Sequence, residues 1–320
     1  MEENAEKTEC FAHFLSKSLK KNINPPVWGI LFLVICGKIT KVKFILAAFS
    51  YKKDSLMGIM AFQYKTAADS PILVAYNREE RPDRPSQAPR IQSGCPRIIC
   101  GIDRKSGGTW FGVNQHGMFA CAINRTKREM PFNPRSRGVL CREMLNCSNP
   151  QKAAEMALKE LQTGNYAGVN YVCADANQAF VVYGGLELSM QEIGPGLHMF
   201  SGNRMDDYND ERQEYVRRQL TLQRLDSSVT FLAVASKTFA RKPDPSGRRG
   251  IVISSGDIQT VSGLLLSLPK KGHGAVLQCT ASAPGDSKYE DVSALLRQVL
   301  STDRNSSSRG GMDEEEEDFI

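Results

Sequence analysis

Asparagine–arginine pairs are the most prominent chemical feature of this 320-residue sequence. They occur at residues 77–78, 124–125 and 203–204, each at the expected end of a strand. A guanidinium presents a planar fork of N–H donors and the amide adds another, so converging strand ends would suit a carboxylate or phosphate. Asparagine also terminates strands and arginine is common at surfaces. We favour a site for Asn77-Arg78 and Asn124-Arg125, and a surface role for 203–204.

Other polar side chains could join that chemistry. Glu79 and Glu80 could serve as acid and base, although salt bridges to neighbouring arginines are the favoured role. Asn170 lies between two apolar runs, where an unbonded amide would be costly. An oxyanion-stabilising amide and a structural hydrogen bond are equally good interpretations of it.

Aromatic and histidine side chains give weaker signals. His198 begins an expected strand and is the only histidine that we consider as a ligand or base, with a structural role still preferred. Trp110 follows two glycines and could wall an apolar pocket or belong to the core. We find no spacing typical of a metal site and no phosphate-binding GxxxxGK[ST] motif.

Two predicted hairpins would position these residues. Apolar runs at 57–64 and 71–76 flank a polar turn, and a turn centred near Ala68 would place Arg78 opposite Gly58. Runs at 109–113 and 118–123 flank a second turn at 114–117. The first hairpin's open corner is where we expect the site.

The rest of the chain supplies sheets and their covering helices. The pattern predicts helices at 136–146, 150–163, 210–225, 227–240 and 289–300. It predicts hairpins pairing 169–174 with 179–183 and 186–193 with 197–201, strands at 97–102, 251–254, 260–268 and 275–279, and loops at 81–96 and 241–249. Hairpins make antiparallel sheets, so the expected architecture is α+β, with two stacked sheets and helices outside.

Composition limits the possible functions. The net charge of +6 is spread out, and no basic stripe alternates with aromatics, so nucleic-acid binding is not expected. The nine cysteines form no CxxC and mostly lie in apolar runs, which is typical of reduced thiols and predicts a cytoplasmic protein. We expect no required cofactor and no metal, and the oligomeric state stays open.

The two ends differ in composition from residues 57–302. Residues 1–56 contain lysines and an apolar run at 27–36 that is too short to span a bilayer. We interpret them as a poorly ordered extension or start-site artefact, with a weak membrane anchor as the lesser alternative. Residues 303–320 carry an acidic run and are expected to be a disordered tail.

The ordered motifs of residues 57–302 resemble the NRDE family, which includes transport and Golgi organisation protein 2. They are Asn77-Arg78-Glu79-Glu80 with Arg84-Pro85, 108–114, Asn124, 136–138, 168–170 leading to Asp175, 260–262 and 289–293. The resemblance implies a four-layer αββα sandwich like that of N-terminal-nucleophile hydrolases. It also implies links to Golgi organisation, secretion, Golgi or mitochondrial association, and the handling of haem or acyl-lipid species.

The nucleophile is where the sequence departs from the family. Members characteristically begin Met-Cys, and the exposed cysteine would attack with its own α-amine as base. Here Gly58 follows Met57, so the expected thiol is missing. We therefore lean against an enzyme and predict a binding or trafficking protein for a small amphipathic anion such as haem or an acyl-CoA. An amidohydrolase with another nucleophile, and an adaptor acting through its termini, are the alternatives.

Overall fold

A computed structural model of the chain describes residues 58–244, 250–254, 256–270 and 274–301. Their strands form two antiparallel sheets. The six-stranded sheet has the order β10-β1-β2-β11-β12-β13, and the seven-stranded sheet runs from β3 to β9 in chain order. The first contains β1 (Ile59–Tyr64), β2 (Ile72–Glu80), β10 (Gly196–Phe200), β11 (Gln259–Leu268), β12 (Val276–Cys279) and β13 (Glu290–Asp291). The second contains β3 (Ser86–Gln92), β4 (Ile98–Asp103), β5 (Phe111–Asn114), β6 (Phe119–Asn124), β7 (Val169–Ala174), β8 (Ala179–Gly184) and β9 (Leu188–Glu192).

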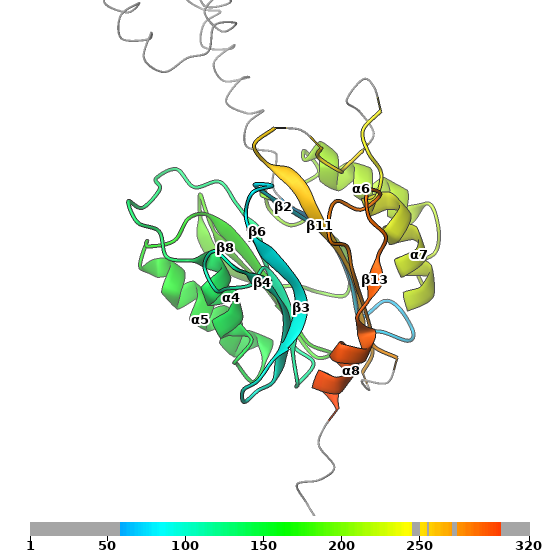
Figure 1. Cartoon of the computed structure of the whole chain (residues 1–320), viewed down its shortest axis with the longest axis horizontal. Coiled ribbons are helices and arrows are strands. Elements are labelled where there is room, and N and C mark those ends of the chain that lie inside the picture. The colour runs from blue at the N-terminus through cyan, green and yellow to red at the C-terminus, as the bar shows by residue number, and fades with distance from the viewer. Residues whose placement is uncertain (1–57, 245–249, 255, 271–273, 302–320) are drawn as a thin grey trace, which may run out of the picture. The chain divides into compact units, whose positions relative to one another are not determined.

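Helices cover the outer face of each sheet (Figure 1). The helices are α4 (Arg137–Met144), α5 (Pro150–Gln162), α6 (Glu211–Thr221), α7 (Ser228–Phe239) and α8 (Ser293–Leu300). Helices α4 and α5 share an apolar core with the seven-stranded sheet, and α6 and α7 share another with the six-stranded sheet. A third core fills the space between the sheets. Helix α8 contacts strands of both sheets and adds Leu296 and Val299 to this central core. The predicted α+β sandwich of four αββα layers is confirmed.

Local sequence explains where helices α4 to α7 start. Ser136, Asn149, Asp210 and Ser227 stand at their N-caps, and each side chain accepts a backbone N–H of the first turn. Such caps satisfy donors that have no partner within the helix. The predicted helices at 136–146, 150–163 and 227–240 are confirmed to within about two residues at each end. Helix α6 ends at Thr221, earlier than predicted.

Several predicted elements were wrong. Residues 186–193 and 197–201 do not form a hairpin: β9 pairs with β8, and β10 pairs with β1 in the other sheet. The predicted loop 81–96 contains β3, whose Pro89 is tolerated because β3 is an edge strand with an irregular register. Residues 251–254 form no strand, and the last helix starts at Ser293.

The predicted extension at 1–56 and tail at 303–320 lie outside the described residues. Within the described part of the chain, none of the helices has both the length and the apolar character that crossing a membrane requires.

Candidate functional site

The first hairpin has the register that its sequence predicts. Ile59 lies opposite Asn77, so Gly58 lies opposite Arg78 at the start of β1. On the other side of β1, Met60 lies opposite Phe200, which brings Gly58 beside the residues that follow β10. The corner predicted from sequence therefore forms at the end of the six-stranded sheet.

A polar pocket of about 380 Å³ opens at this corner. The end of β2, the β4–β5 turn and the start of α4 supply its walls. Its lining consists of Tyr76, Arg78, Glu79, Glu80, Arg84, Asp103, Lys105, Ser106, Thr109, Trp110, Ala122, Asn124, Asn133, Pro134, Arg135, Ser136, Arg137, Gly138 and Ala167. Cationic side chains outnumber acidic ones in this set, so the pocket favours an anion.

Arg78 is the most informative residue of the pocket. It is 5% exposed, and its guanidinium carbon lies 4.2 Å from the centroid of the Trp110 ring. Its nearest carboxylate is Glu80, with Nη2 3.8 Å from Oε2, and its Nη1 is buried without a hydrogen-bond partner. Burial lowers the pKa of Arg78, against the attraction of Glu80. An unpaired buried N–H on a cation is costly, so Arg78 is suited to receive an anionic ligand.

The N-terminus of α4 reinforces the positive charge. Ser136, Arg137 and Gly138 line the pocket, and a helix N-terminus carries a partial positive charge. Arg137 donates through Nη1 to the Gly168 carbonyl at 2.9 Å, and burial lowers its pKa. The sequence predicted a helix beginning at residue 136, but only the fold brings this helix end into the same pocket as Arg78.

Arg84 closes another side of the pocket. It forms a two-point contact with Asp103, with Nη2 2.6 Å from Oδ2 and Nε 3.3 Å from Oδ1. Burial works to raise the pKa of Asp103, but the Arg84 hydrogen bonds and charge hold it below its usual value. Arg84 is thus held by a close two-point ion pair, whereas Arg78 has only the longer ion pair with Glu80.

An apolar slot of about 150 Å³ adjoins the polar pocket. Tyr76 and Trp110 line both, so these two rings form the shared wall. Trp110 fits there because Gly101 lies against its ring: a Cβ at position 101 would be 2.5 Å from ring carbon Cζ2. Phe111, Leu264 and Val292 are among the slot's other apolar residues. Together, the pocket and the slot could hold a charged head and an apolar tail.

The alternation of β2 separates the four charged or polar residues of 77–80. Asn77 faces the helix layer, where Nδ2 donates to the Phe239 carbonyl at 2.9 Å. Glu79 also faces that layer and binds the Arg212 guanidinium through both carboxylate oxygens. Burial raises the pKa of Glu79 to about 7, against the opposing effect of Arg212. An anionic ligand in the pocket would therefore be met by Arg78, because Asn77 and Glu79 are already bonded to partners in the helix layer.

Asn124 lines the pocket. Arg125 and Asn170 instead belong to a hydrogen-bonded group that links the seven-stranded sheet to the loop after β10. Arg125 Nη1 donates to Asn170 Oδ1 at 3.0 Å. Asn170 Nδ2 donates to the carbonyls of Ser201 and Asn203 at 3.0 and 2.8 Å. Both amide N–H groups are already used, which favours the structural interpretation of Asn170 over the oxyanion one.

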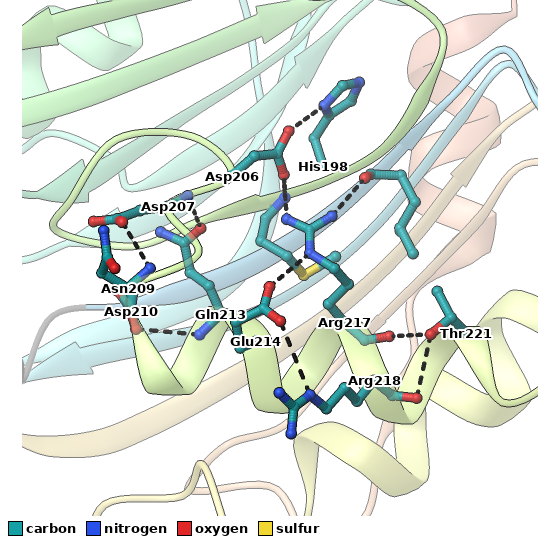
Figure 2. Close-up of polar contacts among 12 residues, drawn as sticks. His198, Asp206, Asp207, Asn209, Asp210, Gln213, Glu214, Arg217, Arg218 and Thr221 are labelled. Carbon is teal, nitrogen blue, oxygen red and sulfur yellow. Dashed lines mark hydrogen bonds and ion pairs between the residues drawn. The ribbon is translucent and has the colours of Figure 1, made fainter.

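His198 lies outside the pocket lining, in a separate polar network beside α6 (Figure 2). Its Nδ1 is 2.8 Å from Asp206 Oδ2, and its Nε2 is 2.9 Å from the Gly194 carbonyl. Asp206 also accepts from Arg217 Nη2 at 2.6 Å and from the Met199 N–H at 2.8 Å. The network fixes the loop that follows β10, whose carbonyls hold Asn170.

No side chain at position 58 could act as a nucleophile without movement of Tyr76. A Cβ on Gly58 would be 2.9 Å from both Cε2 and the hydroxyl oxygen of Tyr76. Cys100 and Cys279 are poor substitutes for such a nucleophile, because burial raises the pKa of Cys100 to about 11 and of Cys279 to about 12. Within the described residues, no group of three or more His, Cys, Asp or Glu side chains is arranged to hold a metal ion.

Comparison with known proteins places the chain in a family. The family model described as Transport and Golgi organisation 2 matches residues 57–236. The chain belongs to the Transport and Golgi organisation 2 family. A Bos taurus relative, Transport and Golgi organization protein 2 homolog, is 26% identical over 192 residues, which cover 55% of this chain and 68% of that protein. The Homo sapiens homolog is 27% identical over 111 residues, covering 34% and 40%.

Solved structures show a distant likeness to this member of the Transport and Golgi organisation 2 family. A mutant of conjugated bile acid hydrolase from Clostridium perfringens shares 11% identity at a TM-score of 0.44, covering 74% of this chain and 93% of that one. Penicillin V acylase from Agrobacterium tumefaciens shares 12% identity at a TM-score of 0.40, covering 69% and 82%.

Proposed function

We propose that this Transport and Golgi organisation 2 family protein binds a small amphipathic anion and does not cleave it. The anionic head would occupy the polar pocket, and an apolar tail would pass the Trp110 ring into the slot. The observation that carries this proposal is Arg78, a buried guanidinium whose Nη1 has no hydrogen-bond partner. A bound carboxylate or phosphate would supply the missing acceptor.

The dimensions favour an acyl chain over a flat macrocycle as the tail. The polar pocket falls within the ~300–1,000 Å³ that is usual for ligand pockets, whereas the slot, at about 150 Å³, is smaller. A slot of that size suits a flexible chain or a single ring better than a porphyrin. Acyl-CoA-type ligands are therefore our first choice of ligand and haem the second. We place this binding within intracellular trafficking or secretion.

Binding accounts for the observations better than amide hydrolysis does. Position 58 has no side chain, and the Tyr76 ring occupies the space where one would extend. The four lining hydroxyls all have partners. Those of Thr109 and Tyr76 donate to the Phe111 and Ala122 carbonyls. Ser136 Oγ accepts the Val139 N–H, and Ser106 Oγ accepts from Arg84 Nη2. The described histidines do not line the pocket, so no imidazole base is at hand there.

Ligand titration of Arg78→Ala tests the proposal. We expect the wild-type protein to bind a long-chain acyl-CoA at micromolar concentration, and the variant to bind roughly tenfold to a hundredfold more weakly, because a hydrogen bond to a charged group is lost. Haem is titrated in parallel. Arg218→Ala is the control, because Arg218 is exposed on α6. Unchanged binding of both ligands by Arg78→Ala would refute the assigned pocket.

A further inference from the structure

The loop that joins β6 to α4, residues 125–136, exposes two large apolar side chains. Phe132 is fully exposed, at 107% of its reference area, and Met130 is 61% exposed. Apolar side chains grouped at one exposed site are candidates for a contact surface. Pro131 and Pro134 flank the phenylalanine and restrict the backbone around it.

Hydrogen bonds hold both ends of this loop, so its exposed tip has a defined position. Lys127 Nζ donates to the carbonyls of Gly164 and Tyr166 at 3.2 and 2.8 Å. The Arg135 N–H donates to the Asn165 carbonyl at 2.8 Å. Both ends of the projecting segment are thereby attached to the same α5–β7 connection.

Basic residues lie on both sides of the apolar tip. Arg128 and Arg135 are exposed, and Glu129 is the sole acidic residue among residues 125–136. Arg135 is paired with Glu160 of α5, which leaves Arg128 as the exposed cation next to the tip for which no ion pair is found within the described residues. The neighbouring β8–β9 turn exposes Leu186, and its Gly185 lies against Arg125 and Thr126 at the loop base. Apolar side chains beside basic residues suit attachment to an anionic lipid surface, where both kinds of contact are favourable.

The loop is also part of the ligand pocket. Asn133, Pro134 and Arg135 form one side of the pocket lining, directly after Phe132. A surface that touched Phe132 would thus lie at the pocket entrance. A protein partner fits less well, because two side chains on a loop fall far short of the ~1,200–2,000 Å² that a stable protein interface buries.

We propose that the β6–α4 loop docks the protein on an anionic membrane surface, with Phe132 and Met130 among the lipid headgroups and Arg128 beside lipid phosphates. This peripheral contact turns the pocket entrance toward the lipid from which an amphipathic ligand would come. The docking surface is distinct from Arg78 and does not require that the proposed ligand be correct.

Fluorescence of Phe132→Trp in the full chain tests the docking directly. The wild-type protein, which contains Trp28 and Trp110, supplies the background. With vesicles of phosphatidylcholine and phosphatidylserine, we expect the added tryptophan's emission to shift to shorter wavelength and to be quenched by shallow brominated lipid. Vesicles of phosphatidylcholine alone, or high salt, should weaken both effects. No shift with the anionic vesicles would overturn the proposal.

Cosedimentation with the same vesicles gives an independent measure. Met130→Ser/Phe132→Ser should bind roughly tenfold or more weakly, because two apolar side chains no longer leave water. The control is Leu222→Ser/Val229→Ser, which removes two similarly exposed apolar side chains near the α6–α7 connection. If the test variant and wild type bind equally, any membrane affinity belongs to another segment, such as 27–36. That result would refute the docking role of the β6–α4 loop. Arg78→Ala should bind vesicles like wild type, which separates this proposal from the ligand proposal.

Discussion

Tyr76 lies where a side chain on Gly58 would extend, with its Cε2 and hydroxyl oxygen 2.9 Å from the position of a Cβ. Tyr76 is itself buried at 3% exposure, and its hydroxyl is 3.4 Å from the Ala122 carbonyl of the opposite sheet. Position 58 therefore has no side chain, and while Tyr76 stays in place it has no room for one. The Tyr76 ring instead forms a wall between the pocket and the slot.

Replacing Gly58 by alanine should destabilise the fold. The added methyl would press on a buried ring and on the Asn77 carbonyl, which lies 3.1 Å from the Cβ position. Overpacking of this kind costs about 1–3 kcal/mol. Urea unfolding measures the loss, with Gly194→Ala as the control because a Cβ there meets nothing within 4 Å. Equal stability of the two variants would show that Tyr76 moves aside freely.

Arg78→Met should abolish anion binding while keeping or raising stability. The wild-type side chain buries a cation whose Nη1 lacks a partner, and replacing a poorly paired buried charge by an apolar chain is often neutral or stabilising by ~1–4 kcal/mol. Thermal unfolding and acyl-CoA titration of the same samples check both halves. A large loss of stability would instead mean that Arg78 is a structural residue.

Asp206 should make stability fall in acid. Burial works to raise its pKa, but hydrogen bonds from His198, Arg217 and the Met199 N–H hold it below its usual value. A lowered carboxyl pKa stabilises the folded state above the unfolded pKa, and this contribution is lost as the pH falls through the folded value. Urea unfolding of Asp206→Asn should therefore show a deficit at about pH 6 that narrows below about pH 4, near the unfolded pKa of an aspartate. Exposed Asp226→Asn serves as the control and should show no such pattern.

The buried thiols should resist alkylation in the native protein. Burial raises the pKa of Cys121, Cys141 and Cys173, and a thiol in that state is a weak nucleophile. Peptide mapping after iodoacetamide treatment should find these three unmodified until denaturant is added, whereas exposed Cys95 reacts. Rapid native labelling of one of the three would reopen the amidohydrolase alternative.

Local sequence patterns predicted the first hairpin and its register. The two apolar runs are symmetric about a polar turn, so a single strand register buries the apolar side chains of both runs. The same logic failed for β9 and β10. Their Gly194-Pro195-Gly196 link resembles a hairpin turn, but partner choice depends on the whole sandwich. The site also divides into a part that local sequence predicts and a part that only the whole fold determines. Arg78 was visible from its motif, whereas its unpartnered Nη1 and the approach of Arg137 depend on side chains brought together from distant parts of the chain.

Chain order also bears on how the protein is made. The seven-stranded sheet follows the sequence strand by strand, so each new strand can pair with the one before it as the ribosome releases it. The six-stranded sheet instead needs β1 and β2 from before that stretch and β10 to β13 from after it. In the nascent chain, the β1–β2 hairpin stays unpaired until β10 and β11 are synthesised, and its Phe62 and Val74, which belong to the central core, stay exposed. We expect this hairpin to be the part of the nascent chain that most needs a chaperone.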